Sequence, residues 1–290
     1  MPSITLSIIT PSFNQASFIE ETIQSVLSQN VDVEYVIFDG GSTDGTLEIL
    51  QKYSSKLRWY SEADRGQTHA VNKGILATKG DIIGWLNSDD IYLPDTLELV
   101  RNFFTEHPKV DVLYGDAWHI DIDGNPYEKY PTEVWSFERL KNVCFLSQPA
   151  VFFRRSVVDR FGLLNETLQY CMDYEYWLRL GANGAKFAYL PHLLAGSRMY
   201  ADNKTQSQRH AVHEEIANMM SDLLGKVPDR WLFNFAHVLV EKKGLSREKT
   251  PSRFILEVSL YSIGNAWRWN KSISKDMLAT ILRWNFNQLR

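Results

Sequence analysis

Short apolar runs alternate with longer amphipathic stretches along the first 115 residues. The runs are rich in β-branched and aromatic residues and favour strands, whereas the longer stretches repeat their apolar positions at helical spacing. One helix is expected to begin near Ser17, three residues before Glu20 in the spacing of a capping box, and another at Pro94. Strands are expected at 6–9, 33–38, 57–60, 81–86 and 110–114, with helices between them at 17–27, 44–53, 68–77 and 94–106.

This alternation predicts an α/β fold with a Rossmann-like, mostly parallel sheet flanked by helices. Ligands of such sheets bind beyond the carboxyl ends of the strands, so the residues that follow each strand are candidates for chemistry. Four polar segments stand at these positions, and three of them contain carboxylates: 10–14, 39–42, 62–64 and 87–90.

The remainder of the chain is less regular. Residues 123–126 have the composition of a hairpin turn, and 174–180 have the pattern of a helix. Helical patterns dominate from about Asp202 onward, and the tail from Arg253 mixes tryptophans with basic residues. Packing of this tail against the first domain is the favoured interpretation, and contact with a membrane surface is the alternative.

Composition narrows the class of protein. The chain has 290 residues, with 44% hydrophobic and 23% charged, which is ordinary for a globular protein. A net charge of −4 argues against a nucleic-acid partner. Cys144 and Cys171 lack metal-binding or disulfide spacing, so the reducing cytoplasm is expected, with the inner face of the membrane as an alternative position. A secretory signal and a membrane span are not expected.

Two adjacent carboxylates, Asp89 and Asp90, follow the apolar run 82–86. Their repulsion would be relieved by a cation, and hard oxygen ligands suit Mg²⁺ or Mn²⁺. The alternative is an acidic cap for the next helix. Asp39 precedes two glycines and could accept hydrogen bonds from a ribose or a base, or could only cap a turn.

Other charged residues also allow two interpretations. Arg65 could bind phosphate or only neutralise Asp64, and Asp173 could be a general base or a carboxylate favoured by a helix dipole. No Gly-x-Gly-x-x-Gly, phosphate-loop lysine or Gly-x-Ser-x-Gly pattern occurs, which disfavours nicotinamide, P-loop and serine-hydrolase chemistry.

Taken in order, these segments resemble family 2 glycosyltransferases over roughly the first 200 residues, whereas the tail after about Lys204 is not covered. The similarity lies in 7–14, 23–29, 39–46, 62–74, 87–90, 148–155 and 173–179. The resemblance implies a GT-A fold and inverting transfer of a sugar from a nucleotide-diphosphate donor to a glycan or lipid-linked acceptor, in cell-surface polysaccharide or glycolipid synthesis.

The resemblance also implies roles for residues of this chain. Asp173 would be the catalytic base, and Asp89 and Asp90 would bind a divalent metal, Mg²⁺ or Mn²⁺. The nucleotide sugar would be bound by Thr10, Pro11, Ser12, Asn14, Asp39, Asp64, Arg65, Asn72, Asn87, Asp89, Gln148 and Arg198. The GT-A domain would span 1–203, with a nucleotide-sugar half at 1–115 and an acceptor half at 116–203, followed by a helical extension at 204–290.

The chain departs from the family pattern at three positions. Asn87 replaces the first aspartate of the DXD motif, Met172 stands where an acid is frequent, and Tyr200 stands where many relatives have a metal-binding histidine. Lys204 and Thr205 join Arg198 as candidates for the diphosphate. The departures motivate one alternative, a non-catalytic nucleotide-sugar or glycan-binding module on the same fold. A metal-dependent phosphohydrolase is the other.

Overall fold

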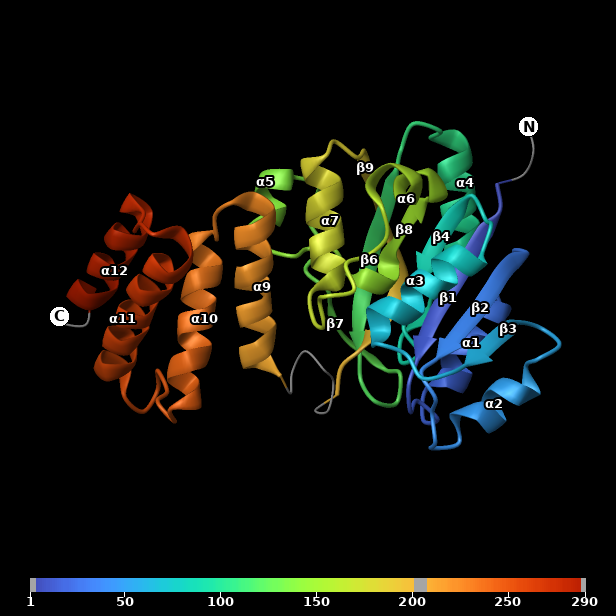
Figure 1. The fold of residues 1–290 in the computed structure, drawn as a ribbon, viewed down its shortest axis with the longest axis horizontal. Coiled ribbons are helices and arrows are strands. Elements are labelled where there is room, and N and C mark those ends of the chain that lie inside the picture. The colour runs from blue at the N-terminus through green and yellow to red at the C-terminus, as the bar shows by residue number, and fades with distance from the viewer. Residues whose placement is uncertain (1–3, 201–207, 288–290) are drawn as a thin grey trace. The chain divides into compact units, whose positions relative to one another are not determined.

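The computed structural model describes residues 4–200 and 208–287, in two compact units that comprise 1–200 and 201–290 (Figure 1). Lys204 and Thr205, two of the diphosphate candidates, and the expected domain boundary at 203 lie outside the described residues. The first unit is an α/β structure and the second is helical, and each is described by itself.

The first unit is built on one sheet, whose strand order is β3-β2-β1-β4-β8-β6-β9-β5, with β7 paired to β6. The pairings give β1, β2, β3, β4, β6 and β9 one common direction, while β8, β5 and β7 run antiparallel to their neighbours. The parallel part is therefore interrupted by antiparallel pairs, but six strands end at the same edge. The strands are β1 (Leu6–Ser12), β2 (Val33–Asp39), β3 (Arg58–Ser61), β4 (Ile82–Trp85), β5 (Ile91–Tyr92), β6 (Val112–Ile120), β7 (Pro126–Lys129), β8 (Val151–Arg154) and β9 (Phe187–Arg198).

Helices cover both faces of this sheet. Alternate residues of each strand point to opposite faces, so each strand contributes to both layers of packing. Leu6 and Ile8 pack in the core with α1, α2 and α4, whereas Ile9 meets Gly74 of α3 and Phe153 contacts Trp177 of α7 on the other face. The helices are α1 (Ile19–Leu27), α2 (Thr46–Lys52), α3 (Gln67–Ala77), α4 (Thr96–Glu106), α5 (Phe137–Leu140), α6 (Arg155–Phe161) and α7 (Met172–Ala182), with a 3-10 turn, η1 (Gln148–Ala150).

The expected strands and helices of the first 115 residues are all present, but three helices begin two residues later than expected, among them the one expected from Asp44, which begins at Thr46. The first helix begins at Ile19, and no side chain caps it, because the carbonyl of Gln15 already accepts from the N–H groups of Phe18 and Ile19. The helix expected from Pro94 begins at Thr96, after Asp95 in a left-handed conformation (φ 64°). The last strand continues to Ile120 because β9 pairs along its length.

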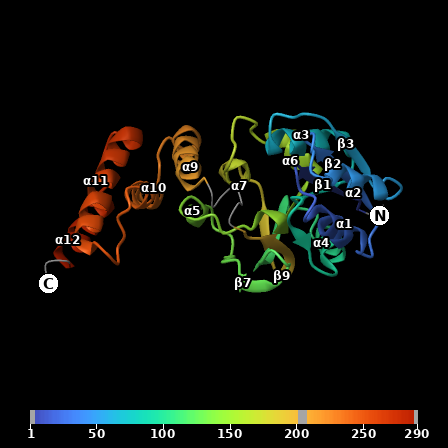
Figure 2. The same ribbon diagram turned by 90° about the horizontal axis from the view of Figure 1, so that it is seen from below.

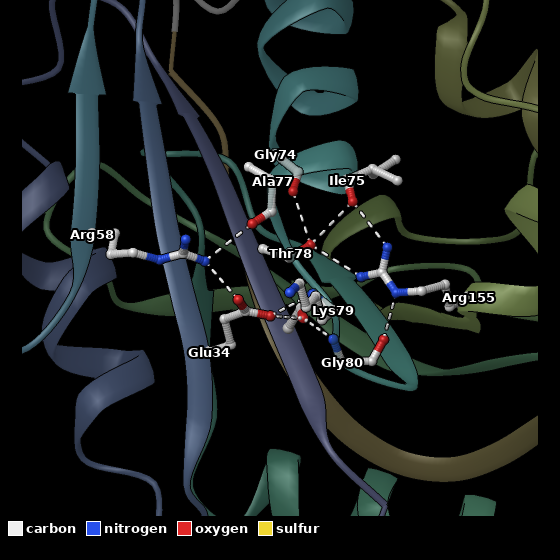
Figure 3. Close-up of polar contacts among 10 residues, drawn as sticks. Glu34, Arg58, Gly74, Ile75, Ala77, Thr78, Lys79, Gly80 and Arg155 are labelled. Atoms are coloured by element: carbon white, nitrogen blue, oxygen red, sulfur yellow. Dashed lines mark hydrogen bonds and ion pairs between the residues drawn. The ribbon is translucent and has the colours of Figure 1, made fainter.

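The edge at the beginning of the strands holds a self-contained polar network (Figure 3). Arg155 donates to the carbonyls of Gly80 and Ile75 and to Thr78 Oγ1, which fixes the end of α3. Glu34 accepts from the Lys79 N–H at 2.6 Å and pairs with Arg58 at 2.6 Å. The charges of Arg155, Arg58 and Glu34 are thus bound within the protein.

The second unit contains four helices among its described residues (Figures 1 and 2). They are α9 (Arg209–Leu224), α10 (Asp229–Lys242), α11 (Pro251–Asn270) and α12 (Lys275–Asn287). Val240 of α10 and Phe254 and Val258 of α11 form its core. In the part of the chain that the structure describes, no helix has the length and apolar character needed to cross a bilayer.

Candidate active site

Residues distant in the sequence converge at the carboxyl edge of the sheet. The loops after β1, β2, β3 and β4 lie here, because these strands are parallel and adjacent. The segment before α7 joins them, since Thr68 Oγ1 at the start of α3 donates to the Leu168 carbonyl at 3.3 Å. The end of β9 is tied to the β4 loop by the Arg198 N–H, which donates to Asp90 Oδ1 at 2.8 Å.

Asn87 organises the loop after β4. Its Oδ1 accepts from Gln67 Nε2 at 2.7 Å and from Trp85 Nε1 at 2.8 Å. Its Nδ2 donates to Gln148 Oε1 at 2.9 Å and to Asp90 Oδ2 at 3.2 Å. Gln148 in turn donates to the Trp85 carbonyl at 2.6 Å. Both predicted site residues therefore have their amide groups engaged in one network.

The carboxylates that follow Asn87 repel each other in a buried setting. Asp90 is buried, and burial and then the charge of Asp89 raise its pKa well above the ordinary value. Burial also raises the pKa of Asp89, although Tyr200 donates its hydroxyl proton to Asp89 Oδ2 at 3.0 Å. A nearby cation would relieve this repulsion. The described residues contain no group of three or more acidic, histidine or cysteine side chains arranged for a metal.

Arg198 is hydrogen-bonded to the loop after β4. Its guanidinium is buried, pairs with Glu21 at 2.6 Å and donates to the carbonyls of Asp89, Asp121 and Ile122. It also lies 4.9 Å from the centre of the Phe18 ring. The predicted contact of Arg198 with a diphosphate would compete with these bonds. That contact stays a prediction.

The loops after β1 and β2 hold each other. Asp39 Oδ2 accepts from the N–H groups of Gly41 and Ser42 and from Ser61 Oγ, at 2.7–3.0 Å. The Asn14 N–H donates to Ser42 Oγ at 2.7 Å, and Asn14 Oδ1 accepts from the Thr43 N–H at 2.9 Å. Asp39 therefore stabilises the loops that border the candidate nucleoside site.

The end of β1 contributes residues with different surroundings. Thr10 is buried and pairs with the Tyr35 hydroxyl at 3.1 Å, and Pro11 is buried beside it. Ser12 is also buried, but its Oγ has no hydrogen-bond partner. Since a buried hydroxyl without a partner is unfavourable, Ser12 is the residue here most suited to accept or donate a bond to a ligand.

The predicted site residues after β3 have different surroundings and partners. Asp64 Oδ1 accepts from the Gly66 N–H at 2.7 Å. Arg65 is exposed and pairs with Glu166 at 2.5 Å. Asn72 is buried and binds the Leu164 backbone and Glu166 through both ends of its amide. Asn72 therefore positions the segment that leads to α7, and its predicted contact with the nucleotide is untested.

Phe13 is a candidate site residue that the sequence did not single out. Its side chain is 60% exposed at the edge of the sheet. A side chain at Gly40 would approach Phe13 Cδ2 to 3.3 Å and Asp64 Oδ2 to 3.1 Å, so these three residues adjoin. An exposed ring beside polar loops can stack on a flat ligand. The available signal was an aromatic residue directly after a strand, inside a polar loop.

Asp173 stands at the beginning of α7 and is partly buried. Burial raises the pKa of its carboxyl to about 6, although the Tyr174 N–H donates to Oδ1 at 2.7 Å. The charge of Asp173 contributes to the raised pKa values of Tyr130 and Cys144, so these groups are its neighbours. A carboxylate with this pKa is matched to proton transfer near neutral pH.

The helix that carries Asp173 is held from behind. Arg179 binds Glu175 at 2.7 Å and donates to the carbonyls of Phe161 and Leu163. Trp177 is buried against Phe153 of β8. These contacts fix α7 on the sheet and therefore fix the position of Asp173.

Comparisons with known proteins agree with this architecture. The model of the family described as "Glycosyl transferase family 2" matches residues 7–162. An uncharacterized glycosyltransferase of Rickettsia felis is 27% identical over 277 residues, which cover 90% of this chain but only 43% of that protein. A chondroitin synthase of Pasteurella multocida is 30% identical, over 71% of this chain and 22% of that protein.

Solved structures share the fold. S. aureus TarS 1–349 in complex with UDP-GlcNAc superposes with a TM-score of 0.66 at 18% identity and covers 98% of this chain and 89% of its own. A mannosyltransferase from Pyrobaculum calidifontis in complex with GDP-Man and Mn²⁺ has a TM-score of 0.60 at 16% identity, over 99% of this chain and 81% of its own. The sheet and its covering helices are therefore those of GT-A proteins.

Proposed function

Because the chain belongs to glycosyl transferase family 2, we propose that it transfers a sugar from a nucleotide-diphosphate donor to a hydroxyl of an acceptor, with inversion at the anomeric carbon. One observation carries the proposal beyond a binding role. Asp173 has a carboxyl whose pKa is raised to about 6, and a general base is useful only if a proton is removed.

In the proposed reaction Asp173 accepts the proton of the acceptor hydroxyl while that oxygen attacks the anomeric carbon. The new glycosidic bond forms as the bond from carbon to the diphosphate oxygen breaks, and the nucleoside diphosphate departs. A single displacement inverts the configuration. No enzyme nucleophile is needed, so a second carboxylate at covalent distance is not expected.

Asp89 and Asp90 would hold a divalent cation, Mg²⁺ or Mn²⁺, whose positive charge stabilises the departing diphosphate. Their raised pKa values and oxygen ligands support this role. Asp90 would be the weaker metal ligand of the two, because both of its carboxylate oxygens already accept hydrogen bonds from within the protein. Asp89 would therefore be the more direct ligand of the cation.

The donor's nucleoside would lie at the loops after β1 and β2. Ser12 Oγ is the buried group without a partner, and the exposed ring of Phe13 can stack on the base. Asp39 and Asp64 border this place. The acceptor is proposed to be a glycan or a lipid-linked sugar, as in synthesis of cell-surface polysaccharide. We place the reaction in the cytoplasm, because the 2 cysteines of the chain lack the spacing of a disulfide framework or a metal site.

The proposal is tested in two steps. Thermal unfolding is first measured with UDP, GDP and their sugars, with and without Mn²⁺, since a ligand that binds the folded state raises the midpoint. Donor turnover is then compared between the wild-type protein and Asp173→Asn, with candidate glycan acceptors present and absent.

The outcomes separate the alternatives. Acceptor-dependent turnover that Asp173→Asn abolishes while nucleotide binding persists supports the transferase. Equal turnover by both proteins would refute the base. Binding without any turnover would favour a non-catalytic module, and sugar release that no acceptor alters would favour a phosphohydrolase.

A further inference from the structure

Half of the large apolar side chains that are exposed in the described residues lie on α11 and α12. On α11 they are Leu256, Leu260 and Trp267, and on α12 they are Leu278, Leu282 and Phe286, each 44–65% exposed. The steps between these residues are four and seven on α11 and four and four on α12, so each set forms a narrow stripe along one side of its helix. Single exposed apolar residues are ordinary, but two parallel stripes are not.

The two stripes form one surface. Phe254 of α11 and Trp284 of α12 both pack against His237 of α10 with the buried sides of their helices. The helices themselves are joined where Asn285 Nδ2 donates to Ser259 Oγ at 3.0 Å. The exposed stripes therefore both face away from α10 and lie next to each other. We call these six residues the α11–α12 face.

Basic residues border this face. Arg253 and Lys271 are exposed at the two ends of the α11 stripe, and Lys275 and Arg283 are exposed on α12. Residues 251–287 contain 5 Lys and Arg against 2 Asp and Glu. The whole second unit contains 14 against 9, whereas residues 1–200 contain 17 against 26. The unit that exposes the apolar stripes therefore has a net positive charge, whereas residues 1–200 have a net negative one.

We propose that the α11–α12 face binds the surface of an anionic phospholipid membrane, with both helices parallel to it. Leucine, tryptophan and phenylalanine side chains would enter the boundary between headgroups and acyl chains, while the bordering lysines and arginines contact lipid phosphates. A second copy of the chain fits less well, because a symmetric contact would bring two basic surfaces together.

This inference goes beyond the proposed transferase and does not depend on it. It would keep the protein at a membrane, where a lipid-linked acceptor is found. Neither α11 nor α12 is long and apolar enough to span the bilayer, so the contact would be reversible and sensitive to salt.

The test is sedimentation of the full chain with vesicles of phosphatidylcholine, alone or mixed with phosphatidylglycerol. The apolar variant carries Leu260→Ser and Leu282→Ser, and the charge variant carries Lys271→Gln and Lys275→Gln. The matched control changes two apolar residues of the first unit that are more exposed than Leu260 and Leu282, Leu76→Ser and Val134→Ser, which are 72% and 74% exposed. Far-UV circular dichroism and the unfolding midpoint check that every variant is folded.

Wild-type protein is expected to bind the anionic vesicles and to release them in high salt. The apolar variant should lose at least about tenfold in partition coefficient, and the charge variant about fivefold for each charge removed. The control should bind like the wild type. Nucleotide-dependent stabilisation should be the same in all four proteins, which separates a failure of this inference from a failure of the proposed function.

Two results would overturn the inference. In one, wild-type protein fails to bind anionic vesicles, or binds them no better than neutral ones. In the other, analytical ultracentrifugation shows a dimer that the apolar variant dissociates, which would make the α11–α12 face a contact between copies of the chain.

Discussion

Replacing Asp173 by asparagine should slow transfer strongly and stabilise the fold at the same time. The asparagine keeps an oxygen for the Tyr174 N–H, which donates to Oδ1 at 2.7 Å in the wild-type protein. It removes the negative charge and the capacity to accept a proton. Loss of a general base typically lowers the rate by about 10²–10⁴-fold, so turnover should fall within that range.

The wild-type rate should depend on pH as the buried carboxyl titrates. With the pKa of Asp173 raised to about 6, about nine tenths of it is ionised at pH 7 and about one tenth at pH 5, so the rate should rise about tenfold over this interval. An ordinary aspartate, with a pKa near 3.8, would leave the rate almost constant from pH 5 to 7. The profile therefore distinguishes a raised carboxyl pKa in the site from an ordinary one.

The free energy of unfolding should fall as the pH rises, whereas the rate increases. Because the folded-state pKa lies above the value of 3.8, the folded state binds the Asp173 proton more tightly than the unfolded state. The resulting stabilisation is complete below about pH 4 and is lost as pH rises through about 6. At pH 8 the ionised carboxylate then costs up to about 3 kcal/mol, which Asp173→Asn should recover.

Two assays check both halves of this prediction. Release of the nucleoside diphosphate from pH 5 to 8 gives the rate, and urea unfolding at pH 4 and pH 8 gives the stability. Asp159→Asn, which changes an exposed carboxylate on α6, is the control and should alter neither. A flat pH–rate profile, or an Asp173→Asn protein that is less stable than wild type at pH 8, would refute the reasoning from burial.

Three further changes have definite expected results. Asp89→Asn should remove the Mn²⁺-dependent part of the stabilisation by nucleotide while the apo protein stays folded, as a thermal-shift assay can measure. Arg198→Met should cost about 1–3 kcal/mol, since the carbonyls of Asp89, Asp121 and Ile122 lose their donor and the half-exposed Glu21 loses its partner; urea unfolding measures this loss. Gly74→Ala should destabilise the first unit by about 1–3 kcal/mol, because the new methyl would lie 2.3 Å from Ile9 Cγ2; the same measurement should show an unchanged m-value.

The sequence predicted the first half of the sheet well because each strand there is a local feature. The residues of β1, β2 and β4 form apolar runs, and the fold buries them on both sides. The later strands carry no such signal. β8 has four residues, and β9 pairs with β6 from more than 60 residues away, with register shifts near Asp116. Such pairing depends on the assembled sheet and cannot be inferred from spacing.

The candidate site divides in the same way. Polar residues directly after strands could be found from the sequence, which is how Asp39, Asp89 and Asp90 became candidates. The groups of the protein that bind the predicted residues could not be found from the sequence. Arg198 is bound by Glu21, 177 residues away, and Asn72 by a segment more than 90 residues away. Only the folded chain shows that two predicted ligands are already bound by the protein.

Asn87 is the clearest case in which the structure changes the meaning of a departure. An aspartate at this position would be a third carboxylate beside Asp89 and Asp90, which already repel each other. It would also lack the donor that Asn87 gives to Gln148 Oε1 and to Asp90 Oδ2. The asparagine therefore stabilises the charged pair that the metal would need. Its presence is consistent with an active transferase, and it no longer favours a non-catalytic module.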